Sequence, residues 1–162
     1  MSTLFLIHGF IGSGKTTFSK KLADHENAVR FSPDEWMSHF YGNNPPQELF
    51  AEYDRRNKDM IWAMAVEFLE RGQNVILDYG FWQRSSRDAY KDCAKQLGVN
   101  CVLYALESDY ETCKQRALKR TAEMPDGELF IDENALQMFW RKFERVNPDE
   151  GALSPPPSLL VI

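Results

Sequence analysis

Gly9-Phe10-Ile11-Gly12-Ser13-Gly14-Lys15-Thr16 matches the phosphate-binding pattern Gly-x-x-x-x-Gly-Lys-[Ser/Thr] at every fixed position. The stretch follows an apolar run at residues 4–7, typical of a buried parallel strand, and precedes residues 17–23, which have helical composition. Glycines let the backbone turn sharply, so that successive N–H groups can surround a phosphate at the positive end of the following helix. The sequence therefore predicts a binding site for a nucleoside triphosphate.

Each part of this loop has an expected task if the triphosphate is ATP. Lys15 is expected to reach the β- and γ-phosphates, and the Thr16 hydroxyl is expected to bind Mg²⁺. A glycine-rich turn with a surface lysine is the alternative interpretation, which the flanking strand and helix disfavour. The expected nucleotide-binding residues of the loop are Gly9, Phe10, Ile11, Gly12, Ser13, Gly14, Lys15, Thr16 and Thr17, with Thr16 as the metal ligand.

The length and composition predict one folded domain. A chain of 162 residues has the size of a single domain, and 43% hydrophobic residues are enough for one core. No apolar run approaches the roughly 18 residues of a membrane-spanning helix, and the first residues do not resemble a cleavable targeting segment. The three cysteines form no Cys-x-x-Cys pair. We therefore expect a cytoplasmic protein without membrane contact and with reduced cysteines.

Strand-like runs alternate with helical segments along the chain, and this alternation predicts an α/β fold. The expected arrangement is a parallel sheet with helices on both faces. A proline-rich connector at residues 154–157 is expected to deliver the last run to the sheet. The runs expected to form strands are residues 4–7, 28–31, 75–77, 101–106 and 159–162.

Asp34 is the candidate general base. It follows the second strand run, where a doubly wound sheet would bring a carboxylate across from the phosphate loop. There it could accept the proton of an acceptor hydroxyl. The alternative role is to complement the dipole of a helix that starts at Pro33. Because Ser32 and Glu35 already form a capping box for that helix, the catalytic role is favoured.

Asp78 is a second candidate carboxylate. It directly follows the strand run at residues 75–77, so we expect it at the carboxyl edge of the sheet, where ligands of open α/β folds bind. It could hold Mg²⁺ through water or touch the acceptor. The structural alternative is an acid that orders the turn at Tyr79-Gly80. The sequence does not decide between these roles.

Arg116 and Arg120 lie four residues apart on a predicted helix and therefore share one face. A helix-breaking segment at residues 124–128 follows them, as at the hinge of a lid. Arg120 would neutralise the transferring phosphoryl group, and Arg116 would stack on the base or bind the same phosphates. The alternative is a solvated basic helix face.

Two aromatic-rich segments, one after Asp34 and one after Asp78, could form an acceptor pocket, although aromatic residues at such spacing also occur in cores. An acceptor that carries a phosphate or carboxylate would suit Arg84 or Arg87. The residues expected to contact the acceptor are Asp34, Trp36, Asp78, Phe81, Arg84 and Arg87.

Together, these features resemble the small P-loop kinases of the polynucleotide kinase, zeta-toxin and chloramphenicol phosphotransferase group. The resemblance spans nearly the whole chain and is carried by the loop at residues 9–16, Asp34, Asp78, the Arg116 and Arg120 pair and the helix at residues 132–148. It implies a three-layer P-loop NTPase fold of the nucleoside-monophosphate-kinase type, with sheet order 2-3-1-4-5. Residues 1–162 would form one kinase domain, with a lid at about residues 117–131.

The resemblance also implies ATP-dependent phosphorylation of a hydroxyl, with Asp34 as the base and Lys15 and Arg120 as the catalytic cations. We expect a small-molecule acceptor. A polynucleotide 5′-hydroxyl kinase is a first alternative, but the net charge of −5 and the lack of an arginine soon after Asp34 disfavour it. An ATP-binding regulatory module is a second alternative, and it would leave Asp34 exposed and without a pocket beside it.

Overall fold

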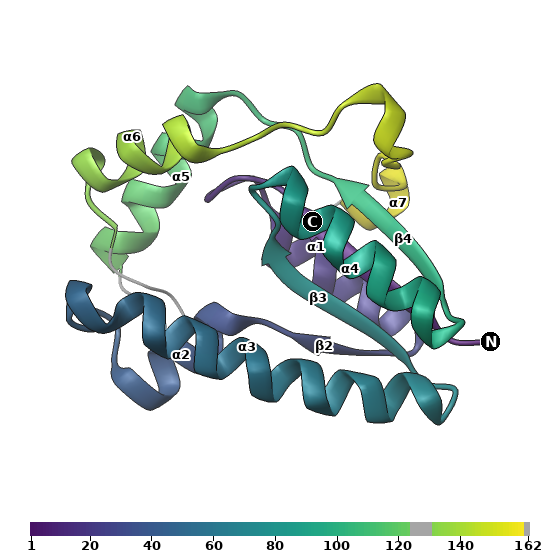
Figure 1. Ribbon diagram of the computed structural model, residues 1–162. Helices are drawn as coiled ribbons and strands as arrows, with labels where there is room; N and C mark the ends of the chain where they lie inside the picture. Colours follow the sequence, from purple (N-terminus) through teal and green to yellow (C-terminus); the bar gives the residue numbers. More distant parts are fainter. Residues whose placement is uncertain (124–130, 161–162) are drawn as a thin grey trace.

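The computed structural model describes residues 1–123 and 131–160. Within these ranges, none of the helices has the length and apolarity needed to cross a membrane. Strands alternate with helical segments as far as α5, with two helices, α2 and α3, between β2 and β3 (Figure 1). The elements are β1 (Thr3–His8), α1 (Lys15–Glu26), β2 (Ala28–Phe31), α2 (Pro33–Tyr41), α3 (Gln47–Glu70), β3 (Asn74–Gly80), α4 (Arg84–Leu97), β4 (Asn100–Ala105), α5 (Tyr110–Glu123), α6 (Glu133–Lys142), a 3₁₀ turn (Pro148–Glu150) and α7 (Pro157–Leu160).

The strands form a four-stranded parallel sheet in the order β2-β3-β1-β4, which confirms the predicted α/β class. β1 lies in the interior of the sheet, since Leu4 pairs with Val75 of β3 on one side and with Cys101 of β4 on the other. Parallel strands present their carboxyl ends at one edge of a sheet, where ligands of such folds bind. The phosphate loop follows β1 at this edge.

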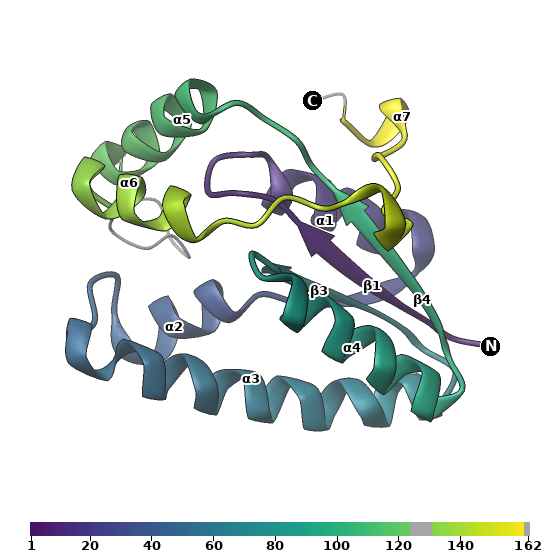
Figure 2. The same cartoon turned by 45° about the horizontal axis from the view of Figure 1, so that its top comes forward.

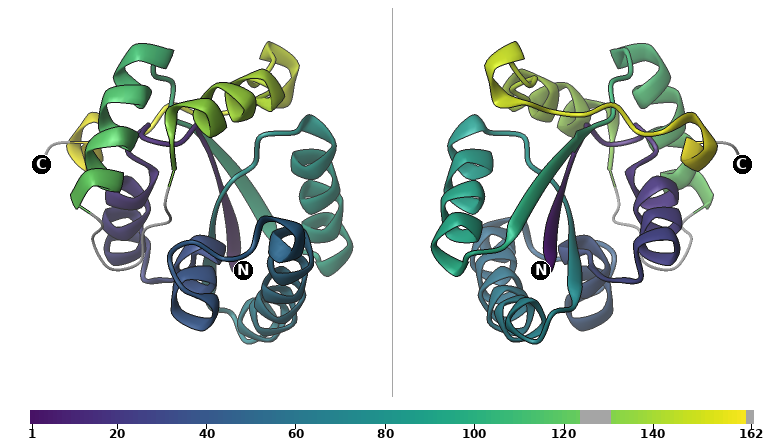
Figure 3. Two further views of the ribbon diagram at one scale, coloured as in Figure 1. Left: turned by 90° about the vertical axis from the view of Figure 1, so that its left-hand side faces the viewer. Right: turned by 90° about the vertical axis from the view of Figure 1, so that its right-hand side faces the viewer.

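Helices cover both faces of the sheet. Successive side chains of a strand point to opposite faces, and β1 is apolar on both of them. Leu4 and Leu6 belong to a core shared with α3 and α4, whereas Phe5 and Ile7 belong to a core shared with α1. Figure 3 shows α1 (purple) on one side of the strands and α4 (teal) on the other. The order of layers is therefore helix, sheet, helix, as the sequence predicts.

The prediction of a fifth strand at residues 159–162 is wrong. Pro157–Leu160 forms the short helix α7, and residues 161–162 lie outside the described ranges. The chain meets the edge of β4 earlier, at Leu153, whose N–H donates to the Leu103 carbonyl at 2.8 Å and whose carbonyl accepts from the Ala105 N–H at 2.9 Å. This bridge is followed almost at once by the proline run, and prolines cannot donate to a ladder. A single bridge thus occupies the place of the expected strand.

Arg87 and Glu150 form a fully buried ion pair that fastens the segment after α6 to α4. The Arg87 guanidinium donates to the Glu150 carboxylate at 2.6 and 3.0 Å and to the Phe81 carbonyl at 2.9 Å, and both side chains of the ion pair are 0% exposed. Arg87 hydrogen bonding lowers the pKa of the Glu150 carboxyl to about 2. The pair therefore contributes stability in the pH range above the ordinary pKa of a glutamate and loses it as the pH falls toward about 2.

Replacing Glu150 with glutamine is expected to reduce the free energy of unfolding by about 3–5 kcal/mol, because Arg87 would keep its charge in the interior without a partner. Urea denaturation at neutral pH measures this loss. The matched control is Asp149→Asn, since Asp149 pairs with Arg84 at 2.8 Å on the surface. Asp149→Asn should reduce the free energy of unfolding by less than about 1 kcal/mol. Equal losses in the two variants would contradict the structural role of the buried pair.

Candidate active site

The phosphate loop connects β1 to α1 and requires glycine at Gly12. Gly12 has φ +80° and Gly14 has φ +97°, which L side chains rarely adopt. A Cβ atom at Gly12 would also collide with the carbonyl oxygen of Cys113 in α5. On its other side the loop is fastened to β3, because the Gly9 N–H donates to the Gly80 carbonyl at 3.0 Å. The loop is therefore held between α5 and the end of β3.

A Gly12→Ala substitution should destabilise the protein more than Gly72→Ala. Gly72 has φ +82°, almost the same backbone conformation, but no atom lies within 4 Å of the position its Cβ would take. Both variants incur a backbone strain of about 1–2 kcal/mol, and only Gly12→Ala adds a collision worth about 1–3 kcal/mol more. Thermal unfolding measures the difference, and ATP titration should show weaker binding for Gly12→Ala alone. Equal midpoints and affinities would contradict the packed loop.

The loop fits a phosphate group. The Ser13 hydroxyl is buried and has no hydrogen-bond partner among the residues that the structure describes. α1 begins at Lys15 with no side-chain cap, since Gly14 stands at the capping position. The first N–H groups of a helix have no partner within the helix, so an uncapped start is suited to an anion. Donors and glycines thus form a cradle of the kind that a triphosphate requires.

Lys15 lies across this cradle. Its ammonium group donates to the Phe10 carbonyl at 3.0 Å, within the loop itself. Burial lowers the pKa of the Lys15 amine, whereas the carboxylates of Asp78 and Asp34 raise it and the charge of Arg120 lowers it. These groups therefore act on one another electrostatically. The structure brings the predicted lysine, both predicted aspartates and the predicted lid arginine into one site.

The side chain of Phe10 anchors the phosphate loop to the surrounding aromatic residues. Its ring is 1% exposed and packs against Trp82 of the loop before α4, Trp140 of α6 and Phe143 at centroid distances of 5.4, 4.9 and 5.3 Å. Ile11 packs at the border of the same cluster. The motif pattern treats these positions as variable, so it does not predict this anchoring of the loop to α6.

Asp34 stands in the first turn of α2, and its carboxylate is not needed to cap that helix. The Ser32 hydroxyl accepts from the Glu35 N–H at 3.4 Å, which is one half of the predicted capping box, whereas the Glu35 carboxylate accepts from Arg30 instead. Asp34 is exposed, whereas the neighbouring Pro33 is buried. The geometry thus leaves the Asp34 carboxylate available for another task.

The surroundings of Asp34 raise the pKa of its carboxyl group. Although the side chain reaches solvent, the surrounding elements desolvate the carboxyl and raise its pKa to about 6. Lys15 opposes this shift, Asp54 and Asp78 add to it, and Lys58 opposes it weakly. A carboxylate with a pKa near 6 is ionised at neutral pH and is a stronger base than an ordinary aspartate. Asp34 therefore titrates differently from an ordinary surface aspartate.

Asp78 lies in β3 and is engaged by two side chains that the sequence reasoning did not single out. It is buried and accepts from the Arg30 guanidinium at 2.8 Å and from the Ser19 hydroxyl at 2.7 Å. Arg30 also donates twice to Glu35 at 3.0 Å. The network joins α1, β2, α2 and β3 around the site. In the sequence, this network is indicated by one feature, the charged residue Arg30 within an otherwise apolar strand run.

The predicted arginine pair lies on α5, beside the loop. Arg116 donates to the Gly12 carbonyl at 3.3 Å, and Arg120 acts electrostatically on Lys15. Of the expected lid at residues 117–131, residues 117–123 continue α5, and residues 124–130 lie outside the described ranges. Figure 2 shows α5 and α6 on one side of the strand ends and α2 with α3 on the other.

Four predicted acceptor contacts are engaged elsewhere in the structure. Arg87 is fully buried against Glu150, and Arg84 donates to Asp149 at 2.8 and 3.1 Å. Phe81 is 3% exposed, and Trp36 is half-buried in the core between the sheet and α3. Local sequence could not reveal the distant carboxylates that occupy both arginines. We therefore do not place these four residues in the site.

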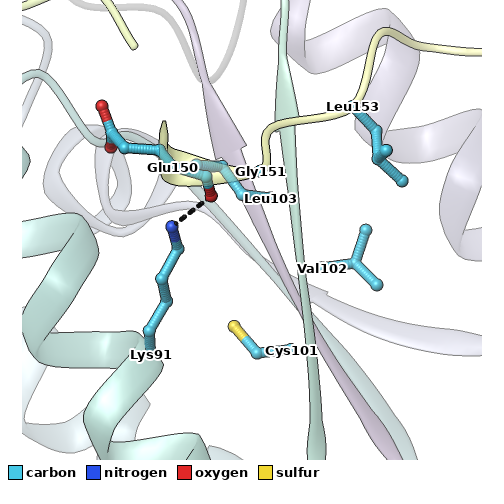
Figure 4. A pocket seen from close by; sticks show the side chains of 7 residues that line it. All are labelled: Lys91, Cys101, Val102, Leu103, Glu150, Gly151 and Leu153. Carbon is cyan, nitrogen blue, oxygen red and sulfur yellow. Dashed lines mark hydrogen bonds between the residues drawn. The ribbon is translucent and has the colours of Figure 1, made fainter. Parts of the chain in front are cut away.

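A cavity of about 390 Å³, whose lining includes no residue of the phosphate loop, lies between α4, β4 and the segment that follows α6 (Figure 4). Lys91 points into this region, and its ammonium group donates to the Glu150 carbonyl at 2.7 Å. Val102, Leu103 and Leu153 contribute apolar walls. The cavity lacks the converging donors and carboxylates found at the phosphate loop, so it is not the candidate site.

Comparisons with known proteins agree with the fold. A family model described as an AAA domain, AAA_33, matches residues 4–146. No curated protein matches the sequence. The chain is similar to the structure of the Pnkp1/Rnl/Hen1 RNA repair complex, with TM-score 0.69 and 22% identity, covering 87% of this chain but only 43% of that one.

Two further similar structures cover nearly the whole chain. One is a sugar kinase from Janibacter sp. HTCC2649, with TM-score 0.63, 18% identity and coverage of 99% of this chain and 91% of that one. The other is the APS kinase CysC of Mycobacterium tuberculosis in complex with AMPPNP and APS, with TM-score 0.61, 17% identity and coverage of 98% and 91%. At these identities the similarity shows the fold.

Proposed function

The chain belongs to the AAA_33 family of P-loop domains, and from this premise we propose that it transfers the γ-phosphoryl group of ATP to a hydroxyl of a small-molecule acceptor. The proposal rests on one observation above the others. A carboxylate with a raised pKa, Asp34, lies in the electrostatic field of the phosphate-loop lysine, Lys15. A kinase needs these two groups on either side of the transferred phosphoryl group.

In this mechanism the chain positions the reactants and neutralises charge. The loop amides and Lys15 bind the phosphates of ATP, and Arg120 balances the charge that develops during transfer. Asp34 orients the acceptor hydroxyl and takes its proton as the oxygen attacks. Arg116, which donates to the loop at Gly12, is suited to the nucleotide rather than to the acceptor.

The residues present fit a magnesium ion held mainly by phosphates and water. The Thr16 hydroxyl is the proposed protein ligand, and Mg²⁺ would supply neutralisation of phosphate charge when bound. Among the described residues, no group of three or more His, Cys, Asp or Glu side chains could hold a metal alone. Asp78 is already engaged by Arg30 and Ser19, so we do not assign it as a direct ligand.

An ATP-binding regulatory module is the second candidate. Asp34 is exposed, as this alternative expects. Such a module has no need for a carboxylate with a raised pKa near the loop lysine, whereas phosphotransfer does. For this reason we place the kinase first.

Two measurements distinguish these candidates. Calorimetric titration with ATP and ADP in the presence of MgCl₂ tests nucleotide binding. ADP release is then followed with a panel of hydroxyl compounds, and mass spectrometry identifies any phosphorylated product. A phosphorylated product supports the kinase. Nucleotide binding without stimulation by any compound, nucleoside or oligonucleotide supports the regulatory module, and no nucleotide binding by folded protein refutes both.

A further inference from the structure

The arginines that could bind an anionic acceptor are paired with carboxylates of the protein. Arg84 pairs with Asp149, and Arg87 pairs with Glu150. The remaining candidate on the strand side of the site, Arg30, donates to Asp78 and Glu35. Breaking such pairs to bind a substrate would leave carboxylates without partners, two of them buried. These three arginines are thus engaged by the protein itself and are not offered to an anionic acceptor.

The charges around Asp34 favour cations and repel anions. Asp54 and Asp78 are the negative groups that act on it, and Lys15 and Lys58 are the positive ones. Lys58 is bound to Asp54 at 2.8 Å, and Lys15 belongs to the phosphate loop. Asp78 is likewise bound to Arg30 at 2.8 Å, so once the loop lysine is engaged by ATP the unpaired charge on the acceptor side is that of the Asp34 carboxylate. A phosphate or carboxylate placed beside Asp34 would meet repulsion.

The helices beside Asp34 also carry aromatic and amide groups. Tyr41 of α2 stacks on Tyr53 of α3 with centroids 3.8 Å apart, and Phe40 is 60% exposed. One turn beyond Tyr53, the Asn57 amide is buried, and its nitrogen has no hydrogen-bond partner in the described part of the chain. Polyhydroxyl compounds offer hydroxyls to carboxylates, oxygens to amide donors and an apolar C–H face to aromatic rings.

From these contacts we propose that the acceptor is an uncharged or positively charged polyhydroxyl compound, the class that includes neutral sugars and amino sugars. This inference rests on the proposed kinase function and specifies its substrate. It replaces the sequence-based expectation that an acceptor phosphate or carboxylate would bind Arg84 or Arg87. It also opposes a polynucleotide acceptor, because each phosphate of a nucleic acid requires a nearby cation.

A panel of acceptors matched in shape but different in charge tests the inference. It contains neutral hexoses and pentoses, polyols, amino sugars and aminoglycosides, together with the corresponding aldonates, sugar phosphates and a 5′-hydroxyl oligonucleotide. For the best acceptor, kcat/KM should exceed that of its anionic counterpart by about 100-fold, as expected from like-charge repulsion. Equal or better turnover of the anionic counterpart would overturn the inference and leave the kinase intact. No turnover with any member would overturn the kinase itself.

A pair of variants on α3 tests whether Asp54 contributes to the preference for a positively charged acceptor. Asp54→Asn should raise KM for a positively charged acceptor about tenfold, the loss of one favourable contact, without changing KM for ATP. Asp59→Asn is the matched control, because Asp59 lies on the same helix, is 66% exposed and pairs with Arg55 at 2.7 Å on the surface. An unchanged acceptor KM in Asp54→Asn, or the same rise in both variants, would overturn the assignment.

Discussion

Replacing Lys15 with methionine is expected to lower kcat for phosphoryl transfer by about 10²–10³-fold. The ammonium group lies in the phosphate cradle, where desolvation makes its charge more effective than it would be in water. Methionine keeps the length and apolar contacts of the side chain but cannot neutralise the charge that develops on the phosphoryl oxygens. Steady-state ADP release with the best acceptor measures the loss.

Lys20→Met is the matched control for this variant, because Lys20 is exposed on the same helix, α1. It should retain wild-type kcat and ATP affinity. If Lys15→Met retained full activity, the loop would not be the site of phosphoryl transfer. A loss of ATP binding without a change in kcat at saturation would assign Lys15 to ground-state binding only.

Asp34→Asn is expected to lower kcat by about 10²–10⁴-fold, the usual contribution of a general base. Asparagine preserves the size and position of the side chain but cannot accept the acceptor proton. Since only the ionised carboxylate acts as a base, wild-type kcat/KM should fall as the pH drops below the raised pKa of about 6. The residual activity of the variant should lack this dependence between pH 5 and 7.

Circular dichroism and ATP titration serve as controls for Asp34→Asn, and both should match the wild type. A wild-type rate in the variant would exclude Asp34 as the base. A pH profile that persists in the variant would assign the titration near pH 6 to another group. These outcomes separate loss of chemistry from loss of fold.

The phosphate loop and the layers around it were predictable from the sequence because each depends on local signals. Glycines at fixed spacing, the apolar run at residues 4–7 and the cap at Ser32 specify backbone conformation within a few residues. The placement of Asp34 and Asp78 also followed from a general rule, since carboxyl ends of parallel strands meet at one edge. The sequence therefore predicted the loop and the strand edge at which these two carboxylates lie, whereas the roles of the residues stay predictions.

Long-range pairing accounts for what the sequence did not reveal. Arg87 finds its partner Glu150 at a distance of 63 residues, and Arg30 finds Asp78 at a distance of 48. No spacing rule connects such positions. From the sequence, an arginine that binds a structural carboxylate therefore cannot be distinguished from an arginine that binds a substrate. The final apolar run at residues 159–162 was ambiguous for a similar reason, because a short apolar run suits a strand or a buried helical turn equally well.

The contact of Phe10 with the rings of Trp82 and Trp140 has a practical consequence. Two indoles are joined through one ring to the backbone that would surround the nucleotide, whereas Trp36 and Trp62 pack in the core on the α3 side of the sheet. The protein thus carries intrinsic fluorophores beside its phosphate loop. Tryptophan fluorescence emission during a nucleotide titration can therefore report conformational change in the loop on ligand binding, without any attached label.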